Sequence, residues 1–276
     1  MGGEDQAVIR RGGYAPLRDY AAVGDGRTVA LIARDGPIKW LCLPDLDSPA
    51  MFDSLLDAES GGRFVLSPRS PFEASRRYLP GTNVLETTFE TSSGVVRVID
   101  AMTIPTAALG PERELVRAVE AVSGSVAMEW ELVPRFGFGV KPTRVGRRAG
   151  VPVATRGADA LALCSWNAGE PETTVGSIRG RFDVAVGERA LFALGVSHQE
   201  PLVIPCRNDV EARLAGGHPH CVATVVRRSL VSLREASSDV FRSANRACSE
   251  STCSDNVMNP RPQTSHQWET GSTELG

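Results

Sequence analysis

The sequence predicts an all-β fold, an antiparallel and supersandwich-like β-sandwich, with one short helix and a disordered C-terminal tail. Three observations indicate this class. Between about residues 28 and 196, short segments alternate apolar and polar side chains. Turn residues separate these segments at near-regular spacing, and few stretches between them have helical length. A parallel α/β sheet would need a helix after each strand, so a sandwich is the better fit.

Alternation is clearest in two segments. In 83–91, Leu85 and Phe89 share one face with Thr87, and in 127–132 Met128 and Trp130 do so with Leu132. Side chains two residues apart point to the same face of a strand, so each segment buries one face and exposes the other. Further strands are predicted at 28–34, 38–43, 63–66, 95–99, 115–122, 160–166, 174–181 and 190–196.

Two hairpin turns are predicted from glycines. Gly36 lies in the turn 34–37, and Gly94 ends the Ser-Ser-Gly turn 92–94. Each supplies the positive φ that a tight reversal requires, so the flanking strands should pair as antiparallel neighbours.

Two helical segments are predicted. In 49–59, Ser48 can cap the helix, Pro49 suits its first turn, and Met51, Phe52, Leu55 and Leu56 would form an apolar face. A connecting helix should begin near Asp209 and end at Gly216-Gly217.

The domain organisation follows from these elements. We expect a flexible N-terminus (1–13), a β-sandwich domain (14–205), a shortened linker-helix region (206–236) and a tail (237–276). The tail holds six large apolar residues, Val240, Phe241, Val257, Met258, Trp268 and Leu275. So little apolar area does not offset the ordering of about 40 residues at about 1–2 kcal/mol each, so the tail is predicted to be disordered.

Charge and cysteine content limit the partners and the compartment. The formal net charge of −3 gives no reason to expect nucleic acid as a partner. No apolar run resembles a signal-peptide core or approaches the about 20 residues that cross a bilayer, so neither export nor a membrane partner is expected. Six cysteines spread over 276 residues are unlike a disulfide scaffold. We therefore expect a cytoplasmic protein with reduced thiols.

Several residue groups allow a functional and a plainer interpretation. Asp45, Asp47 and Asp53 are acidic enough for catalysis or calcium, but turns and a capped helix explain them. Trp40, Trp130 and Trp166 offer a sugar-stacking platform or core side chains, and Trp40 is the preferred candidate for sugar contact. Zinc-ligand types (His218, His220, Cys221, Cys248, Cys253 and His266) lack the spacing of a compact finger. No Ser/His/Asp triad or phosphate loop is recognised, and no metal or cofactor is expected.

A long ordered set of motifs resembles the opening of family 15 glycoside hydrolases of the trehalase and glucoamylase type. It comprises residues 17–36, Ile38-Lys39-Trp40-Leu41-Cys42-Leu43-Pro44 with Asp47-Ser48-Pro49, and then 62–64, 77–87, 100–102, 134–139 and 187–189. The resemblance spans about residues 14–214. Two departures affect possible contacts: Asp45 stands where the family usually has Arg, and Gly137-Phe138 replaces its Asp-Tyr.

The resemblance implies a non-catalytic N-terminal domain. Family members continue into an (α/α)6 barrel whose two glutamates, about 6.5–9.5 Å apart, hydrolyse an α-glucosidic bond with inversion and without an organic cofactor. No such helices are recognised after Leu214, so we expect a missing catalytic domain, through a frameshift or misjoined gene, and no catalytic residue in this chain. Trehalose or another α-glucoside would be reached only through that domain.

By the same resemblance, the residues that shape the substrate entrance or contact the barrel would be Asp25, Arg27, Trp40, Asp47 and Arg135. The alternative is a stand-alone carbohydrate-binding or protein-interaction β-sandwich.

Overall fold

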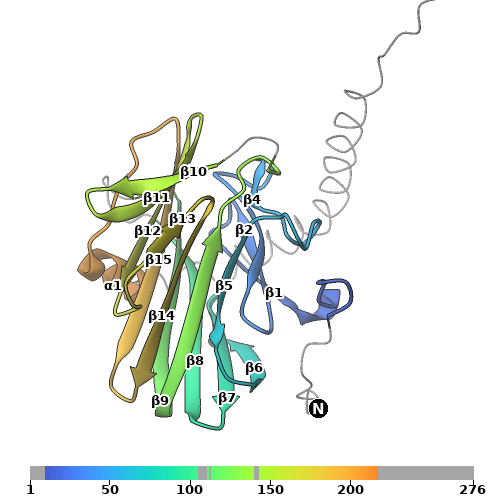
Figure 1. Ribbon diagram of the computed structural model, residues 1–276, viewed down its shortest axis with the longest axis vertical. Coiled ribbons are helices and arrows are strands. Elements are labelled where there is room, and N and C mark those ends of the chain that lie inside the picture. Colours follow the sequence, from blue (N-terminus) through green and yellow to red (C-terminus); the bar gives the residue numbers. More distant parts are fainter. Residues whose placement is uncertain (1–9, 105–110, 112, 140–142, 217–276) are drawn as a thin grey trace, which may run out of the picture. The chain divides into compact units, whose positions relative to one another are not determined.

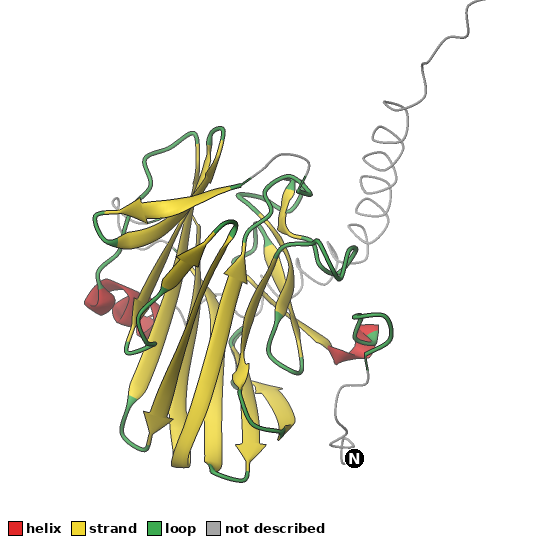
Figure 2. Cartoon of the chain, in the orientation of Figure 1, coloured by secondary structure: helices red, strands yellow, loops and turns green. Residues whose placement is uncertain are grey.

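The computed structural model describes residues 10–104, 111, 113–139 and 143–216. These residues form an antiparallel β-sandwich, as predicted, in which strands make up nearly all of the regular structure (Figure 2). The His and Cys residues considered as zinc ligands lie outside the described residues, as does the predicted disordered tail. None of the helices in the described ranges has the length and apolar character that crossing a membrane requires.

Two layers make up the sandwich. Every pair of named strands is antiparallel. Sheet I contains β1 (Tyr20–Gly24), β2 (Val29–Ala33), β3 (Ile38–Cys42), β4 (Ala50–Phe52), β5 (Arg63–Pro68), β13 (Glu172–Thr174) and β14 (Ser177–Ala185). Sheet II contains β6 (Phe72–Tyr78), β7 (Leu85–Thr91), β8 (Gly94–Thr103), β10 (Arg144–Arg148), β11 (Val151–Arg156), β12 (Asp159–Trp166) and β15 (Arg189–His198).

One long strand, β9 (Arg113–Val133), belongs to both layers (Figure 1). Its first half pairs with β8 and β15 in sheet II, and its second half pairs with β5 and β14 in sheet I. The strand passes from one layer to the other through Ser123-Gly124-Ser125, which is exposed, and Gly124 has a φ of 66°. The sequence predicted two strands here, at 115–122 and 127–132; the structure joins them.

The main core lies between the sheets. Leu115 and Val119 enter it from the first half of β9, and Met128, Trp130 and Leu132 enter it from the second half. The Trp130 ring packs edge-on against Phe192 of β15, with 5.4 Å between ring centroids. Since this contact joins the two sheets, Trp130 is a core residue and not part of an exposed platform.

A buried ion pair lies within the same interior. The Arg117 guanidinium contacts Asp100 at 2.6 Å, and both side chains are 1% exposed. Its Nη2 also donates to the Gly36 carbonyl at 2.7 Å, and the guanidinium lies over the Phe64 ring at 5.1 Å. Gly36 has a φ of 108°, and a Cβ there would lie 2.2 Å from the Leu66 carbonyl oxygen, so the predicted turn glycine also permits close approach of two backbones.

The helix predicted at 49–59 is absent, and the segment forms strand β4 followed by turns. Ala50 and Phe52 pair with Cys42 and Leu41 of β3. The Met51 carbonyl accepts a hydrogen bond from the Arg135 amide at 3.0 Å. Partners on both sides therefore satisfy this backbone, and sheet pairing overrides the helical spacing of the apolar side chains.

The short helix of the fold is instead α1 (Arg207–Gly216), close to the start that the sequence predicted. The described segments also contain a single 3-10 turn, η1 (Leu17–Asp19). Strands β1, β6, β10, β11 and β13 were not predicted, and β4 was predicted as a helix.

A second apolar cluster lies on the outer face of sheet II. Val116 and Ala118 of β9 point to it, away from the main core, together with Leu191 and Ala193 of β15. Val210 and Leu214 of α1 pack onto this cluster. The helix therefore covers part of a sheet face that would otherwise expose apolar side chains.

Candidate functional site

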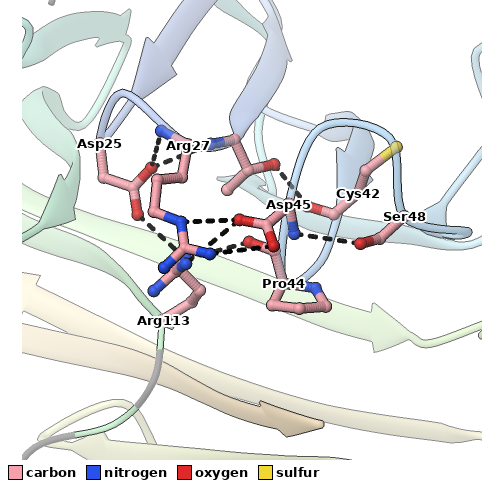
Figure 3. Close-up of polar contacts among 8 residues, drawn as sticks. Asp25, Arg27, Cys42, Pro44, Asp45, Ser48 and Arg113 are labelled. Carbon is pink, nitrogen blue, oxygen red and sulfur yellow. Dashed lines mark hydrogen bonds and ion pairs between the residues drawn. The ribbon is translucent and has the colours of Figure 1, made fainter.

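Two loops at one edge of sheet I contain three of the five residues that were predicted from the sequence to shape a substrate entrance or contact a catalytic domain. Asp25 and Arg27 lie in the turn between β1 and β2, and Asp47 lies in the segment between β3 and β4. The amide of Leu46 donates to the Arg27 carbonyl at 3.0 Å, which joins the two loops through the backbone. Figure 3 shows the polar side chains that gather where the loops meet.

Asp25 shapes the first loop. Its Oδ1 accepts hydrogen bonds from the amides of Arg27 and Thr28 at 2.9 and 3.0 Å. This Asx-type turn explains why the sequence places Asp before Gly26, whose φ is 90°. The Thr28 hydroxyl then donates to the Cys42 carbonyl, which fixes the loop to the end of β3.

Asp45 links the loops through its side chain. The Arg27 Nε and Nη2 donate to its two carboxylate oxygens at 2.7 and 3.0 Å, a bidentate arrangement. Arg113, at the start of β9, donates to the same carboxylate at 3.3 Å and to the Pro44 carbonyl at 3.0 Å. Arg113 also lies 3.5 Å from Asp25, so its guanidinium bridges both carboxylates (Figure 3).

Exposure separates the two arginines. The Arg113 side chain is 6% exposed and the Arg27 side chain is 60% exposed. Arg113 is therefore the structural cation of the cluster, whereas Arg27 presents part of its guanidinium outward. An exposed guanidinium held in place by a carboxylate is well suited to a hydrogen-bond acceptor on a partner.

Electrostatics determine which chemistry these carboxylates can perform. Partial burial opposes ionisation of Asp45, but hydrogen bonds from Arg27 and Arg113 outweigh it and lower the pKa of Asp45. A carboxyl group that stays ionised cannot donate a proton to a leaving group near neutral pH. Asp45 therefore holds the two loops together and is not suited to act as a general acid.

Asp53, which the sequence places near Asp45 and Asp47, lies outside this cluster. Its Oδ1 accepts from the Gly62 amide at 2.6 Å, and burial raises its pKa to about 6. Within the described ranges, no three His, Cys, Asp or Glu side chains form a group that could hold a metal ion. Asp45 and Asp53 thus make contacts within loops, although the capped helix that the plainer interpretation assumed for this segment is absent.

The structure does not bring Trp40 and Arg135 into the cluster. Trp40 is 4% exposed, so its ring offers little surface to a sugar, and Trp166 packs beside the apolar cluster of sheet II. Arg135 donates to the carbonyls of Pro134 and Gly176, both at 3.0 Å. Asp47 is exposed at the tip of its loop.

Arg113 is the residue of the cluster that sequence reasoning missed. The predicted strand began at Leu115, and no local pattern connects Arg113 to loops about 70–90 residues earlier. Only the pairing of strands distant in sequence, here the start of β9 with β15 and β8, places it where it can reach Asp25 and Asp45.

Comparison with known proteins gives the family. The model of the family described as "Trehalase-like, N-terminal" matches residues 11–166, more than half of the chain. A trehalase of Mycolicibacterium smegmatis is 34% identical over 149 residues, covering 46% of this chain and 21% of that protein. A trehalase of Mycobacterium tuberculosis is 35% identical over 144 residues, with the same two coverages. Trehalase 1 of Sulfolobus acidocaldarius is 34% identical over 125 residues, covering 45% and 20%.

The chain thus spans about a fifth of the length of these curated relatives. Among solved structures, a putative kojibiose phosphorylase from the human microbiome aligns with a TM-score of 0.37 and 6% identity, covering 75% of this chain and 34% of that one. That similarity is too distant to support a functional conclusion. The family model and the relatives agree, and the chain belongs to the trehalase-like N-terminal domain family.

Proposed function

We propose that this chain is the non-catalytic support domain of a glycoside hydrolase that cleaves α-glucosidic bonds. One observation carries the proposal: the family match is to an N-terminal domain, and the trehalases that align with this chain do so over about a fifth of their length. Trehalose and short α-glucans are the proposed substrates of the whole enzyme, of trehalase or glucoamylase type. They would meet the catalytic domain and not this sandwich, and neither nucleic acid nor a membrane is a proposed partner.

The state of the buried carboxylates supports this role. Asp100 is paired with Arg117, and Glu114 is 2% exposed and paired with Arg213 at 2.7 Å. Asp25 and Asp45 are held by Arg113. Glycoside hydrolysis needs one carboxyl group that donates a proton and a second that activates water across an open space. These four carboxylates, neutralised by arginine, do not meet that need. Asp53, whose pKa burial raises to about 6, is held by the Gly62 amide within its own loop.

The domain would act by presenting a rigid edge to the catalytic domain. The Asp25–Arg27 turn and the loop that carries Asp47 are joined by backbone and ion-pair contacts, and they expose Arg27 and Asp47. We propose that these two side chains contact the barrel near its substrate entrance.

The cytoplasm is the proposed location. Cys42 and Cys164 are buried free thiols, and burial raises their pKa to about 12 and about 11. Such thiols stay protonated and unreactive, as suits a protein that does not depend on disulfides. The frameshift hypothesis concerns residues after Leu214, and translation of the other two reading frames tests it: barrel motifs absent from both would reject it.

Two assays test the proposed function. The purified chain should release no glucose from trehalose or maltose above a buffer blank. A chimera in which this chain's matching segment replaces that of the Mycolicibacterium smegmatis trehalase should hydrolyse trehalose. In the chimera, Arg27→Gln should lower kcat/KM several-fold, whereas Arg179→Gln, on the outer face of sheet I, should not.

Turnover by the chain alone would contradict the proposal. A second contradicting result is an inactive chimera that circular dichroism shows to be folded. A stand-alone carbohydrate-binding module predicts instead saturable glucan binding to the isolated chain in calorimetry.

A further inference from the structure

A buried lysine on the outer face of sheet I lacks an acceptor. Lys39 lies on β3, between the core residue Ile38 and Trp40, and it is 7% exposed. In the part of the chain that the structure describes, its ammonium group makes no hydrogen bond and no ion pair. Most of the side chain is buried, but Nζ is not among the buried atoms that lack a hydrogen-bond partner, so the ammonium group itself reaches solvent, from where an anion can approach it.

The residues around Lys39 add further positive charge. Ile38 pairs with Phe64 of β5, and both point into the core, so Lys39 and Arg63, which flank that pair, lie on neighbouring strands. Like charges close together on neighbouring strands destabilise a sheet. Burial, followed by the charges of Arg10 and Arg63, lowers the pKa of Lys39 to about 8.

The carboxylates nearby are already engaged. Asp35, in the turn before β3, accepts hydrogen bonds from Arg10 at 2.8, 2.7 and 2.6 Å. Glu131 of β9 accepts from Arg63 at 3.1 Å. Three cations and two carboxylates leave one positive charge uncompensated around the ammonium group. Tyr20, the other titratable group beside Arg10, is neutral because burial raises its pKa above 10.0.

We propose that Lys39, Arg63 and Arg10 bind a small oxyanion on the outer face of sheet I. The ammonium group offers three donors, and Arg63, which donates to Glu131 through Nη2, keeps further N–H groups for the oxygens of sulfate, phosphate or a phosphate ester. Arg10, whose guanidinium donates to Asp35 and to the Gly13 carbonyl, contributes positive charge. The bound anion replaces repulsion between Lys39 and Arg63 with attraction to both. The site is independent of the proposed function, since it uses no residue of the Asp25–Asp45 cluster.

The chain offers a direct readout, because its sequence holds only two lysines, Lys39 and Lys141. In Lys141→Arg protein grown with 13C-lysine, the remaining lysine signal reports Lys39 alone. In chloride buffer its Cε shift should titrate with a pKa of about 8. In sulfate at equal ionic strength, the pKa should rise by about 1 pH unit, since an anion within hydrogen-bond reach favours the charged amine.

Further arms identify the source of the oxyanion. Inorganic phosphate and glucose 6-phosphate should both raise the pKa of Lys39. Whichever of the two binds with higher affinity identifies the ligand as the free ion or the ester. Acetate should raise the pKa by less. Sulfate should also raise the Tm, and Lys39→Met should abolish that increase. Arg179→Gln, on the same sheet face but outside the site, is the matched control and should keep both responses.

The result that overturns the proposal is a Lys39 titration curve that is identical in sulfate and in chloride at equal ionic strength. An equal response in Lys39→Met would also overturn it. If Lys39→Met does not fold, the titration of Lys39 in the Lys141→Arg protein still decides the matter.

Discussion

The two outer faces of the sandwich differ in polarity, and β9 contributes to both. In its first half, Leu115 to Val119 are buried on both sides, and the outward-pointing Val116 and Ala118 join the apolar cluster under α1. In its second half, Glu129 and Glu131 point outward and pair with Arg181 and Arg63. The same strand is therefore covered on both faces in sheet II and on one face in sheet I.

This difference shows that the side-chain pattern of a strand determines whether a sheet face packs against another element or faces solvent. A continuous apolar run such as Leu115–Val119, interrupted only by the internally paired Arg117, has no side that can face solvent. A segment that alternates Glu with Met, Trp and Leu has such a side. The apolar first half of β9 alone therefore indicates that another element covers the outer face of sheet II. In the structure that element is α1.

The strongest test places the same side chain on the two halves of β9. Val116→Lys puts a charge into the covered face of sheet II, where Val116 is 0% exposed, and should lower the free energy of unfolding by more than about 3 kcal/mol. Ala127→Lys puts it on the open face of sheet I, opposite Asp183, and should change that energy by less than about 0.5 kcal/mol. Urea unfolding followed by tryptophan fluorescence measures both. Equal losses would mean that the two faces are covered alike.

The ion pair that fixes α1 gives the next largest effect. Arg213 donates two hydrogen bonds to Glu114 at 2.8 and 2.7 Å, and Glu114 is also bonded to the Thr103 hydroxyl at 2.6 Å. Arg213→Met leaves a buried carboxylate without its cation and should cost about 2–4 kcal/mol.

Its control lies on the same helix. Arg207→Met removes an exposed pair with Glu211 and should cost less than about 0.5 kcal/mol. Glu114→Gln added to Arg213→Met should restore part of the loss in the same urea assay, because the buried charge is then gone. A loss in Arg207→Met as large as that in Arg213→Met would show that helix propensity, and not the ion pair, holds α1.

Acidity should affect stability through Asp53. Burial raises its pKa to about 6 from 3.8, so the folded state holds the proton more tightly than the unfolded state does. Its contribution is therefore fully present below pH 3.8 and is lost as the pH rises through 6, with a total of up to about 3 kcal/mol.

Asp53→Asn isolates this contribution, because the amide oxygen can still accept from the Gly62 amide. The Tm of the parent protein relative to Asp53→Asn should fall between pH 4 and pH 7. A constant difference over that range would mean that the pKa of Asp53 is not raised in the folded state, which would contradict the prediction.

The smallest effect is expected on the open face of sheet I. Arg179 pairs with Glu172 at 3.1 Å, with side chains 58% and 67% exposed. Arg179→Gln should change the free energy of unfolding by less than about 0.5 kcal/mol in urea, since solvent screens such pairs. A loss above about 1.5 kcal/mol would indicate that this face is covered in solution.

The fold could be predicted largely because its strands carry local patterns. Alternation at Leu85–Phe89 and Met128–Leu132 and the glycines at 36 and 94 reflect burial and backbone conformation, which act over a few residues. The predicted helix at 49–59 was wrong, because pairing of Ala50 and Phe52 with β3 cannot be read from the segment itself. Strand β6 is half-buried or exposed along its whole length. Its sequence therefore lacks the alternation of apolar and polar residues by which a strand can be predicted.

The candidate site was predictable only in part. Asp25 and Arg27 stand in a recognisable turn, and Asp47 lies in the loop that contacts it. The long-range partner Arg113 and the bidentate pair of Asp45 with Arg27 depend on strand pairing across the sandwich. Burial of Trp40 likewise depends on tertiary packing, since a strand tryptophan can face either way.

The most direct test of the contrast between the two faces is amide hydrogen exchange along β9 in the full chain and in a Val210→Asp/Leu214→Asp variant. The two charges should detach α1 from sheet II. Exchange should then accelerate at least tenfold at residues 115–119 and 190–194, while residues 126–132, in sheet I, keep their rates. Equal acceleration in both halves of β9, or in neither, would contradict the assignment of α1 as the cover of one face alone.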